Sequence, residues 1–164
     1  MKITPLPLLS IFVLLSLLTI SCSFSTANIG SAVMAKDVKS DTKEPVNVTN
    51  TYDASDKILH CVVKLANAPD STKVRARWIA VKAEGVEPNF KITESDITAG
   101  SGNVDFTLTP GASGFPAGDY KVEIYLDPDT ERGKNPAKEV PFSIKGSAVP
   151  PPSETTTPTE TPTN

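Results

Sequence analysis

Residues 119–126 read DYKVEIYL, and residues 74–82 read VRARWIAVK. A β-strand points successive side chains to opposite faces of its sheet, so a period of two predicts a strand with one buried and one solvated face. The first stretch follows this period, with apolar or aromatic residues at every second position: Tyr120, Val122, Ile124 and Leu126. Both stretches are therefore predicted to be strands, and they decide the fold class.

Similar short alternating runs continue through the middle of the chain. Further strands are predicted at residues 48–52, 58–65, 90–92, 103–109 and 137–145. No segment keeps a helical period, although residues 94–99 are compatible with one helical turn. About seven short strands separated by turn residues are typical of an all-β, single antiparallel two-sheet sandwich. This domain is predicted to span residues 48–146.

Composition narrows the possible functions. A chain of 164 residues has room for one ordinary domain. Its 16 basic and 19 acidic residues give a net charge of −3, which does not favour nucleic acid as a partner. There is one histidine, and no motif places a nucleophile beside a base. We therefore expect a protein that is not an enzyme and has no cofactor.

The beginning of the chain has the organisation of an export signal. Lys2 precedes an apolar run at residues 8–20, and small residues follow. The run is shorter than the roughly 20 apolar residues that a membrane-spanning helix needs. Its length and order are those of a secretory signal peptide.

Residues 18–22, LTISC, resemble the lipobox of bacterial lipoproteins. The resemblance implies a signal peptide at 1–21 and acyl chains on Cys22 that anchor the protein to the membrane of the cell envelope. Ser23, rather than aspartate, follows the cysteine, which favours the outer membrane in Gram-negative lipoproteins. Thr19 departs from the family pattern, because leucine is the commonest residue three positions before the lipidated cysteine. The alternative is ordinary cleavage after residues 25–27, which would release a periplasmic or secreted protein.

Two segments that flank the predicted domain lack its alternation. Residues 22–47 are rich in Ser, Thr, Ala, Lys and Asp, and we expect them to form a flexible tether. Residues 147–164 are rich in Pro and Thr, a composition typical of a disordered tail that is partly polyproline II.

Cys61, Trp78 and Tyr120 occur in the order found in immunoglobulin-like domains, and residues 118–120 resemble the tyrosine corner of that fold. The resemblance implies an immunoglobulin-like or fibronectin III-like sandwich. Val122 stands where the second cysteine of the family would be, so we expect Cys61 to be a buried thiol without a disulfide. In bacterial surface proteins such domains act as spacers, adhesion modules or partner-binding modules.

An immunoglobulin-like arrangement would place the strands at 74–82 and 119–126 in one sheet. Their outward side chains would include Arg75, Arg77, Ile79 and Tyr125, residue types that are enriched at binding surfaces. Two interpretations remain open. The four residues recognise an envelope protein or a glycan, or else Arg77 covers Tyr125 and pairs with Glu123 as ordinary sheet decoration. A carbohydrate-binding or enzyme-accessory module is the alternative function.

Two further groups have weaker signals. His60 is expected on an outer face, opposite Cys61, as a surface residue. Asp127, Asp129 and Glu131 place carboxylates at every second position, as calcium-binding loops do, but the glycine is one place late and Arg132 intervenes. We expect a solvated loop there, with weak calcium binding as the alternative.

Overall fold

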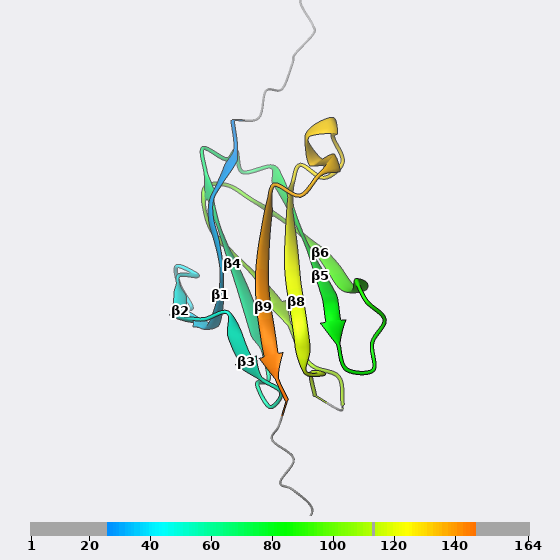
Figure 1. The fold of residues 1–164 in the computed structure, drawn as a ribbon. Coiled ribbons are helices and arrows are strands. Elements are labelled where there is room, and N and C mark those ends of the chain that lie inside the picture. The colour runs from blue at the N-terminus through cyan, green and yellow to red at the C-terminus, as the bar shows by residue number, and fades with distance from the viewer. Residues whose placement is uncertain (1–25, 113, 147–164) are drawn as a thin grey trace, which may run out of the picture.

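Two β-sheets packed face to face make up the computed structural model, which describes residues 26–112 and 114–146 (Figure 1). The predicted signal peptide, Cys22 and the Pro/Thr tail lie outside these residues. A short 3₁₀ helix, η1, spans Glu131–Lys134. The strands of the described residues are β1 (Asn28–Val38), β2 (Pro45–Val48), β3 (Thr51–Asp53), β4 (Leu59–Ala66), β5 (Thr72–Ala83), β6 (Phe90–Ala99), β7 (Gly102–Leu108), β8 (Gly118–Leu126) and β9 (Lys138–Lys145).

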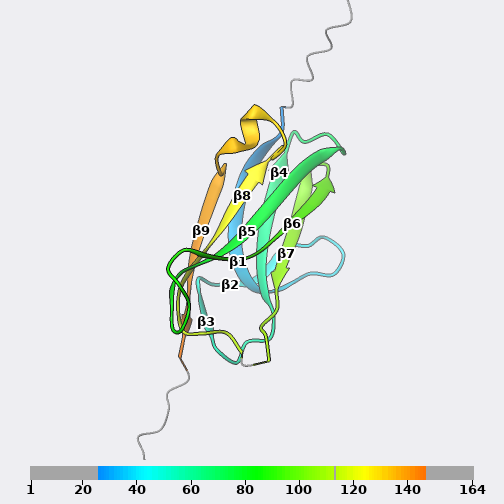
Figure 2. The ribbon, with the colours of Figure 1, turned by 90° about the vertical axis from the view of Figure 1, so that its right-hand side faces the viewer.

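The strands are divided between a four-stranded and a five-stranded sheet. Sheet A has the order β2-β1-β4-β7, and sheet B has the order β3-β9-β8-β5-β6 (Figures 1 and 2). The prediction of an all-β, two-sheet protein is confirmed. It differs in detail, because the described residues form nine strands, and β3 pairs in parallel with β9 while the other pairs are antiparallel.

The domain begins earlier than predicted. Residues 22–47 were expected to form a flexible tether, but they contain β1 and the start of β2, so this expectation is wrong from Asn28 onward. The segment is a strand because β1 pairs with β4 on one side and with β2 on the other, and it contributes Met34 to the core. These tertiary contacts outweigh a weak local alternation.

The prediction was also wrong about residues 90–99. Instead of a short edge strand followed by a helical turn, they form the ten-residue strand β6 at one edge of sheet B. Every residue of β6 before Ile97 is exposed, so the strand lacks the apolar alternation that marks a half-buried strand. The β5 register skips Ile92 between the partners of Trp78 and Ile79, which is a β-bulge.

Aromatic side chains fill the space between the two sheets. Phe142 stacks on Tyr120 with ring centroids 5.3 Å apart and meets Tyr52 and Trp78 edge-on, each at 5.9 Å. Cys61 is fully buried in the same core, as predicted, and is a free thiol. Burial raises the pKa of this thiol to about 12, so it stays protonated and unreactive near neutral pH.

The strand order and two local contacts are immunoglobulin-like. Neighbours β1-β4-β7 and β9-β8-β5-β6 correspond to the A-B-E and G-F-C-C′ strands of that architecture. Tyr120 at the start of β8 donates a hydrogen bond to the Pro116 carbonyl at 2.6 Å, as in a tyrosine corner. Val122 is paired with Trp78 across β8 and β5 and occupies the core position of the missing cysteine.

Candidate binding surface on sheet B

The structure brings the four predicted binding residues together on the outer face of sheet B. Arg75, Arg77 and Ile79 come from β5, and Tyr125 of β8 lies directly opposite Arg75 in the register. Their arrangement follows from the alternation of β5, which sends Trp78 and its like-facing neighbours into the core. Ile79 is only 8% exposed, so the face is closely covered by its own side chains.

Arg77 makes the contacts that one of the two sequence interpretations anticipated. Its guanidinium lies 4.9 Å from the centroid of the Tyr125 ring, and Nη1 donates to the Tyr125 hydroxyl at 3.0 Å. The hydroxyl in turn donates to Glu123 Oε2 at 2.6 Å. Arg77 Nε also donates to Glu94 at 3.1 Å. Arg77 therefore covers Tyr125 and links three neighbouring strands.

Arg75 has an acidic partner that sequence reasoning missed. Its Nε and Nη2 donate to the two carboxylate oxygens of Asp96 at 2.6 and 2.8 Å. These bonds hold the pKa of Asp96 below its usual range. Asp96 and Glu94 belong to β6, whose strand character was not recognised. The sequence signal for this pairing was that acidic residues at every second position of β6, Glu94 and Asp96, match arginines at every second position of β5.

Glu123 is the buried centre of the charged face. Burial opposes its ionisation, but hydrogen bonds from Lys121 and Tyr125 outweigh that effect and lower its pKa. Lys121 Nζ lies 2.8 Å from Glu123 and 3.0 Å from Glu139 on β9. The resulting charge ladder crosses sheet B from β9 to β6 and consists of Arg75, Arg77, Glu94, Asp96, Lys121, Glu123, Tyr125 and Glu139.

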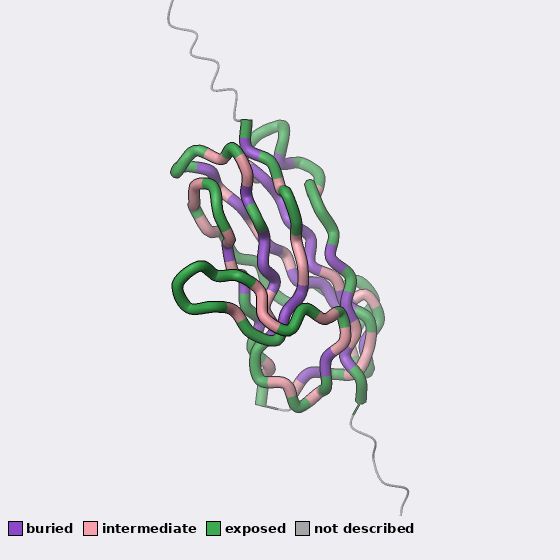
Figure 3. Tube along the Cα trace, turned by 90° about the vertical axis from the view of Figure 1, so that its left-hand side faces the viewer, coloured by how far each residue is buried: buried purple, intermediate pink, exposed green. Residues whose placement is uncertain are grey.

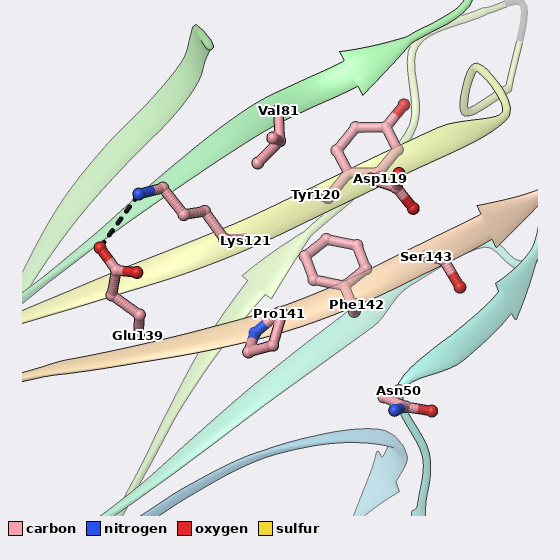
Figure 4. A pocket seen from close by; sticks show the side chains of 9 residues that line it. All are labelled: Asn50, Val81, Asp119, Tyr120, Lys121, Glu139, Pro141, Phe142 and Ser143. Carbon is pink, nitrogen blue, oxygen red and sulfur yellow. Dashed lines mark hydrogen bonds and ion pairs between the residues drawn. The ribbon is translucent and has the colours of Figure 1, made fainter.

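A shallow hollow of about 360 Å³ adjoins this ladder (Figure 4). The Lys121–Glu139 pair closes one end, and Tyr120 and Asp119 lie toward the other. Its complete lining is Asn50, Val81, Asp119, Tyr120, Lys121, Glu139, Pro141, Phe142 and Ser143. Sequence reasoning missed the hollow because it forms where β8, β9 and the residue before β3 meet, which only the topology reveals.

His60 lies on the outer face of sheet A, as predicted, but it is not a simple surface residue. Its side chain is mostly buried, and Nδ1 lies 2.9 Å from Asp105 Oδ2 on the neighbouring strand β7. No motif in the sequence had placed a carboxylate beside this histidine. The cysteine that follows it, Cys61, points to the opposite face and into the core.

The three carboxylates considered for calcium do not converge. Asp129 pairs with Lys73 at 2.5 Å, Glu131 with Lys134 at 2.7 Å, and Asp127 lies 3.8 Å from Arg132. Across residues 26–112 and 114–146, no group of three His, Cys, Asp or Glu is placed to hold a metal ion. Each of the three carboxylates instead has a separate basic partner.

Comparisons with known proteins find similarity in the fold alone. No protein-family model and no curated protein matches the chain. An immunoglobulin-like protein from Pseudomonas aeruginosa matches with 9% identity and a TM-score of 0.47, over 73% of this chain and 96% of that one. A mutant β-glucosidase from Listeria innocua, in complex with laminaribiose, matches with 12% identity and a TM-score of 0.40, over 73% of this chain and 16% of that one. The strand order and the tyrosine corner of the described domain are similar to those of immunoglobulin-like β-sandwiches.

Proposed function

We propose that this chain is a lipid-anchored exported protein whose immunoglobulin-like domain is a non-catalytic binding or assembly module at the bacterial cell envelope. The observation that carries the proposal is the outer face of sheet B, where the charge ladder adjoins the hollow. Arginine and tyrosine side chains that are already held in place lose little freedom when a partner binds. An envelope protein is the favoured partner because the face carries both charges in alternation.

The state of the reactive groups supports a non-catalytic role. The Cys61 thiol is buried and protonated, and His60 is paired with Asp105 on the other side of the sandwich. Glu123 has a lowered pKa and is engaged by Lys121 and Tyr125. A general acid or base works best with a pKa near the operating pH, which the environment of Glu123 opposes.

The position of the first described residues determines how the proposed anchor would hold the domain. Thr26 Oγ1 donates to the Asn67 carbonyl at 3.0 Å, and Arg132 donates to the Ala27 carbonyl, so the chain is attached to the domain from Thr26 onward. Cys22 precedes Thr26 by four residues, which span at most about 14 Å. Acyl chains on Cys22 would therefore keep this end of the domain close to the membrane.

The two ends of the sandwich then have different surroundings. The chain enters the domain at the end that carries η1 and leaves from the opposite end, where β9 finishes (Figure 1). A lipid on Cys22 would hold the entry end of the domain nearer to the membrane than the exit end.

Anchoring is tested by comparing the native protein with a Cys22→Ala variant. We expect the native protein in the membrane fraction with added acyl mass at residue 22, and the variant in the soluble fraction. If both are soluble and begin near Asn28, the anchoring proposal is wrong.

Binding is tested by crosslinking in intact cells with an Arg77→Ala, Tyr125→Ala double variant. Lys64→Ala provides a matched control, because Lys64 is exposed on the outer face of sheet A. We expect the double variant to fold and to lose at least about tenfold of any crosslinked envelope partner, while the control retains it. Retention by the double variant would show that this face is not the binding surface.

A glycan is the second candidate ligand, and it rests on the lining of the hollow. Asn50, Asp119 and Ser143 supply polar groups beside the apolar Val81 and Pro141, a combination that suits a sugar ring. Affinity electrophoresis through gels that contain wall or storage glycans tests this alternative. Retardation that an Asp119→Ala variant abolishes would favour a carbohydrate-binding module.

A further inference from the structure

An apolar cleft of about 200 Å³ opens at the end of the sandwich where the chain leaves the domain. It lies between β6 at the edge of sheet B and the segment that joins β7 to β8. We call this cleft the end cleft. The lining residues that matter for the argument are Val86, Phe90, Ile92, Phe115, Pro116 and Tyr120. The cleft is distinct from the hollow on the outer face of sheet B, with which it shares Tyr120 alone.

Two large apolar side chains of the end cleft are open to solvent. Phe90 is 51% exposed and Ile92 is 37% exposed, which places them among the few exposed large hydrophobic residues of the described part of the chain. The β-bulge in β6 leaves Ile92 without a partner on β5, so both residues border the same cleft. Exposed apolar surface gathered around a cleft marks a binding site.

The course of the chain brings one particular segment to this cleft. Strand β9 ends at Lys145, and the next residue, Gly146, lies against Ala117. A Cβ atom added to Gly146 would be 3.4 Å from the Cβ of Ala117. Ala117 directly follows Pro116, a residue of the end cleft. The chain therefore leaves the domain at the rim of the cleft.

The residues that follow have the chemistry that such a cleft accepts. Residues 149–152 read VPPP, and they form an apolar stretch before the polar remainder SETTTPTETPTN. Consecutive prolines favour polyproline II, which loses little conformational entropy on binding and packs into grooves lined by aromatic side chains. Only residues 147 and 148 lie between Gly146 and this stretch, and two extended residues span about 7 Å.

We propose that residues 149–152 dock into the end cleft of the same molecule and cover Phe90 and Ile92. The segment that follows, residues 153–164, would then start from a defined place on the exit end of the domain. This inference does not depend on lipidation or on a ligand at sheet B.

The experiment compares three full-length mature proteins by NMR spectroscopy: the native chain, a variant with Pro150, Pro151 and Pro152 changed to serine, and a control with Pro158→Ser and Pro162→Ser. We expect the first variant to shift the amide signals of Phe90 and Gly114, and the control to leave them unchanged. A hydrophobic dye, ANS, should bind the first variant at least about twofold more than the native chain, because the apolar cleft is uncovered.

Two results would overturn the proposal. Identical Phe90 and Gly114 signals in all three proteins would show that the cleft does not hold residues 149–152. Signals that move toward those of the Pro150–152 variant on dilution would show that the segment docks into a second copy instead of its own chain.

Discussion

The outward side chains of the two sheets are covered in different ways. On sheet B the outward residues of β5 and β8 are mostly charged, and they cover one another through pairs across strands, so that Ile79 is 8% and Tyr125 7% exposed. On sheet A the turn between β1 and β2 crosses the outer face, where Asn103 of β7 donates to the Thr42 carbonyl at 3.0 Å (Figure 3). Val62 points outward from β4, yet it is only 2% exposed.

This contrast shows that strand alternation alone does not decide which residues meet solvent. Alternation assigns a side chain to one face of its sheet, and the path of the rest of the chain decides whether that face stays open. Sheet A buries apolar side chains on both faces near Val62, so its outer surface is partly occupied by the protein itself. On sheet B the outward residues are covered by their own charged neighbours instead, which form the surface that a partner would meet.

The largest expected effect on stability comes from introducing a glutamate at an outward position of each sheet in two separate variants. Val62 lies opposite Val33 and Asp105, whereas Ile79 lies opposite Lys91 and Lys121. A carboxylate at residue 62 would be buried beside another carboxylate, so Val62→Glu should lose about 3 kcal/mol or more of unfolding free energy. Ile79→Glu should lose less, about 1–2 kcal/mol, because Ile79 is also buried but two lysines can pair with the new carboxylate. Urea unfolding at pH 7 measures both, and equal losses would contradict the contrast.

A smaller effect is expected from acid, and it should centre on sheet B. The pKa of Glu123 and that of Asp96 are lowered in the folded protein. Because the unfolded chain binds these protons at higher pH, the stabilisation is complete above the unfolded pKa of about 4 and is lost as the pH falls through the lowered values.

A Glu123→Gln variant separates this contribution from the rest. It should lose about 1–2 kcal/mol at pH 7, because charge-assisted bonds from Lys121 and Tyr125 are weakened. The difference from the native protein should shrink as the pH falls from 5 to 2, as urea unfolding at each pH would show. A constant difference over that range would mean that Glu123 does not titrate as described.

The smallest effect is expected at the turn that covers sheet A. Asn103→Ala removes one exposed hydrogen bond to Thr42 and should cost about 0.5–1 kcal/mol. Amide exchange should quicken at Lys39 and Lys43, whose backbone bonds close the turn. Thr107→Ala, on the same face of β7, serves as the control. Unchanged exchange at both amides would show that Asn103 does not hold the turn in place.

The predictions from sequence succeeded where the polarity of a residue and its place in an alternating strand determine whether it is buried or faces outward. Trp78 and Cys61 are in the core, and Arg77 lies over Tyr125 on an outer face. They failed for β1 and β6, whose strands depend on pairing with β4 and β5. Neither strand shows the strong apolar alternation of a half-buried strand, because β6 lies at an exposed edge and β1 is only partly buried.

Sequence alone determined the all-β class, the buried face of the central strands and the residues that gather on sheet B, because side-chain alternation is a local property of an extended chain. Tertiary structure decided which charges pair with Arg75 and Arg77, where the hollow and the end cleft open, and that Val62 is covered. Those features join residues that are far apart in the sequence, such as Asn103 and Thr42. They depend on strand order and register, which local alternation does not specify.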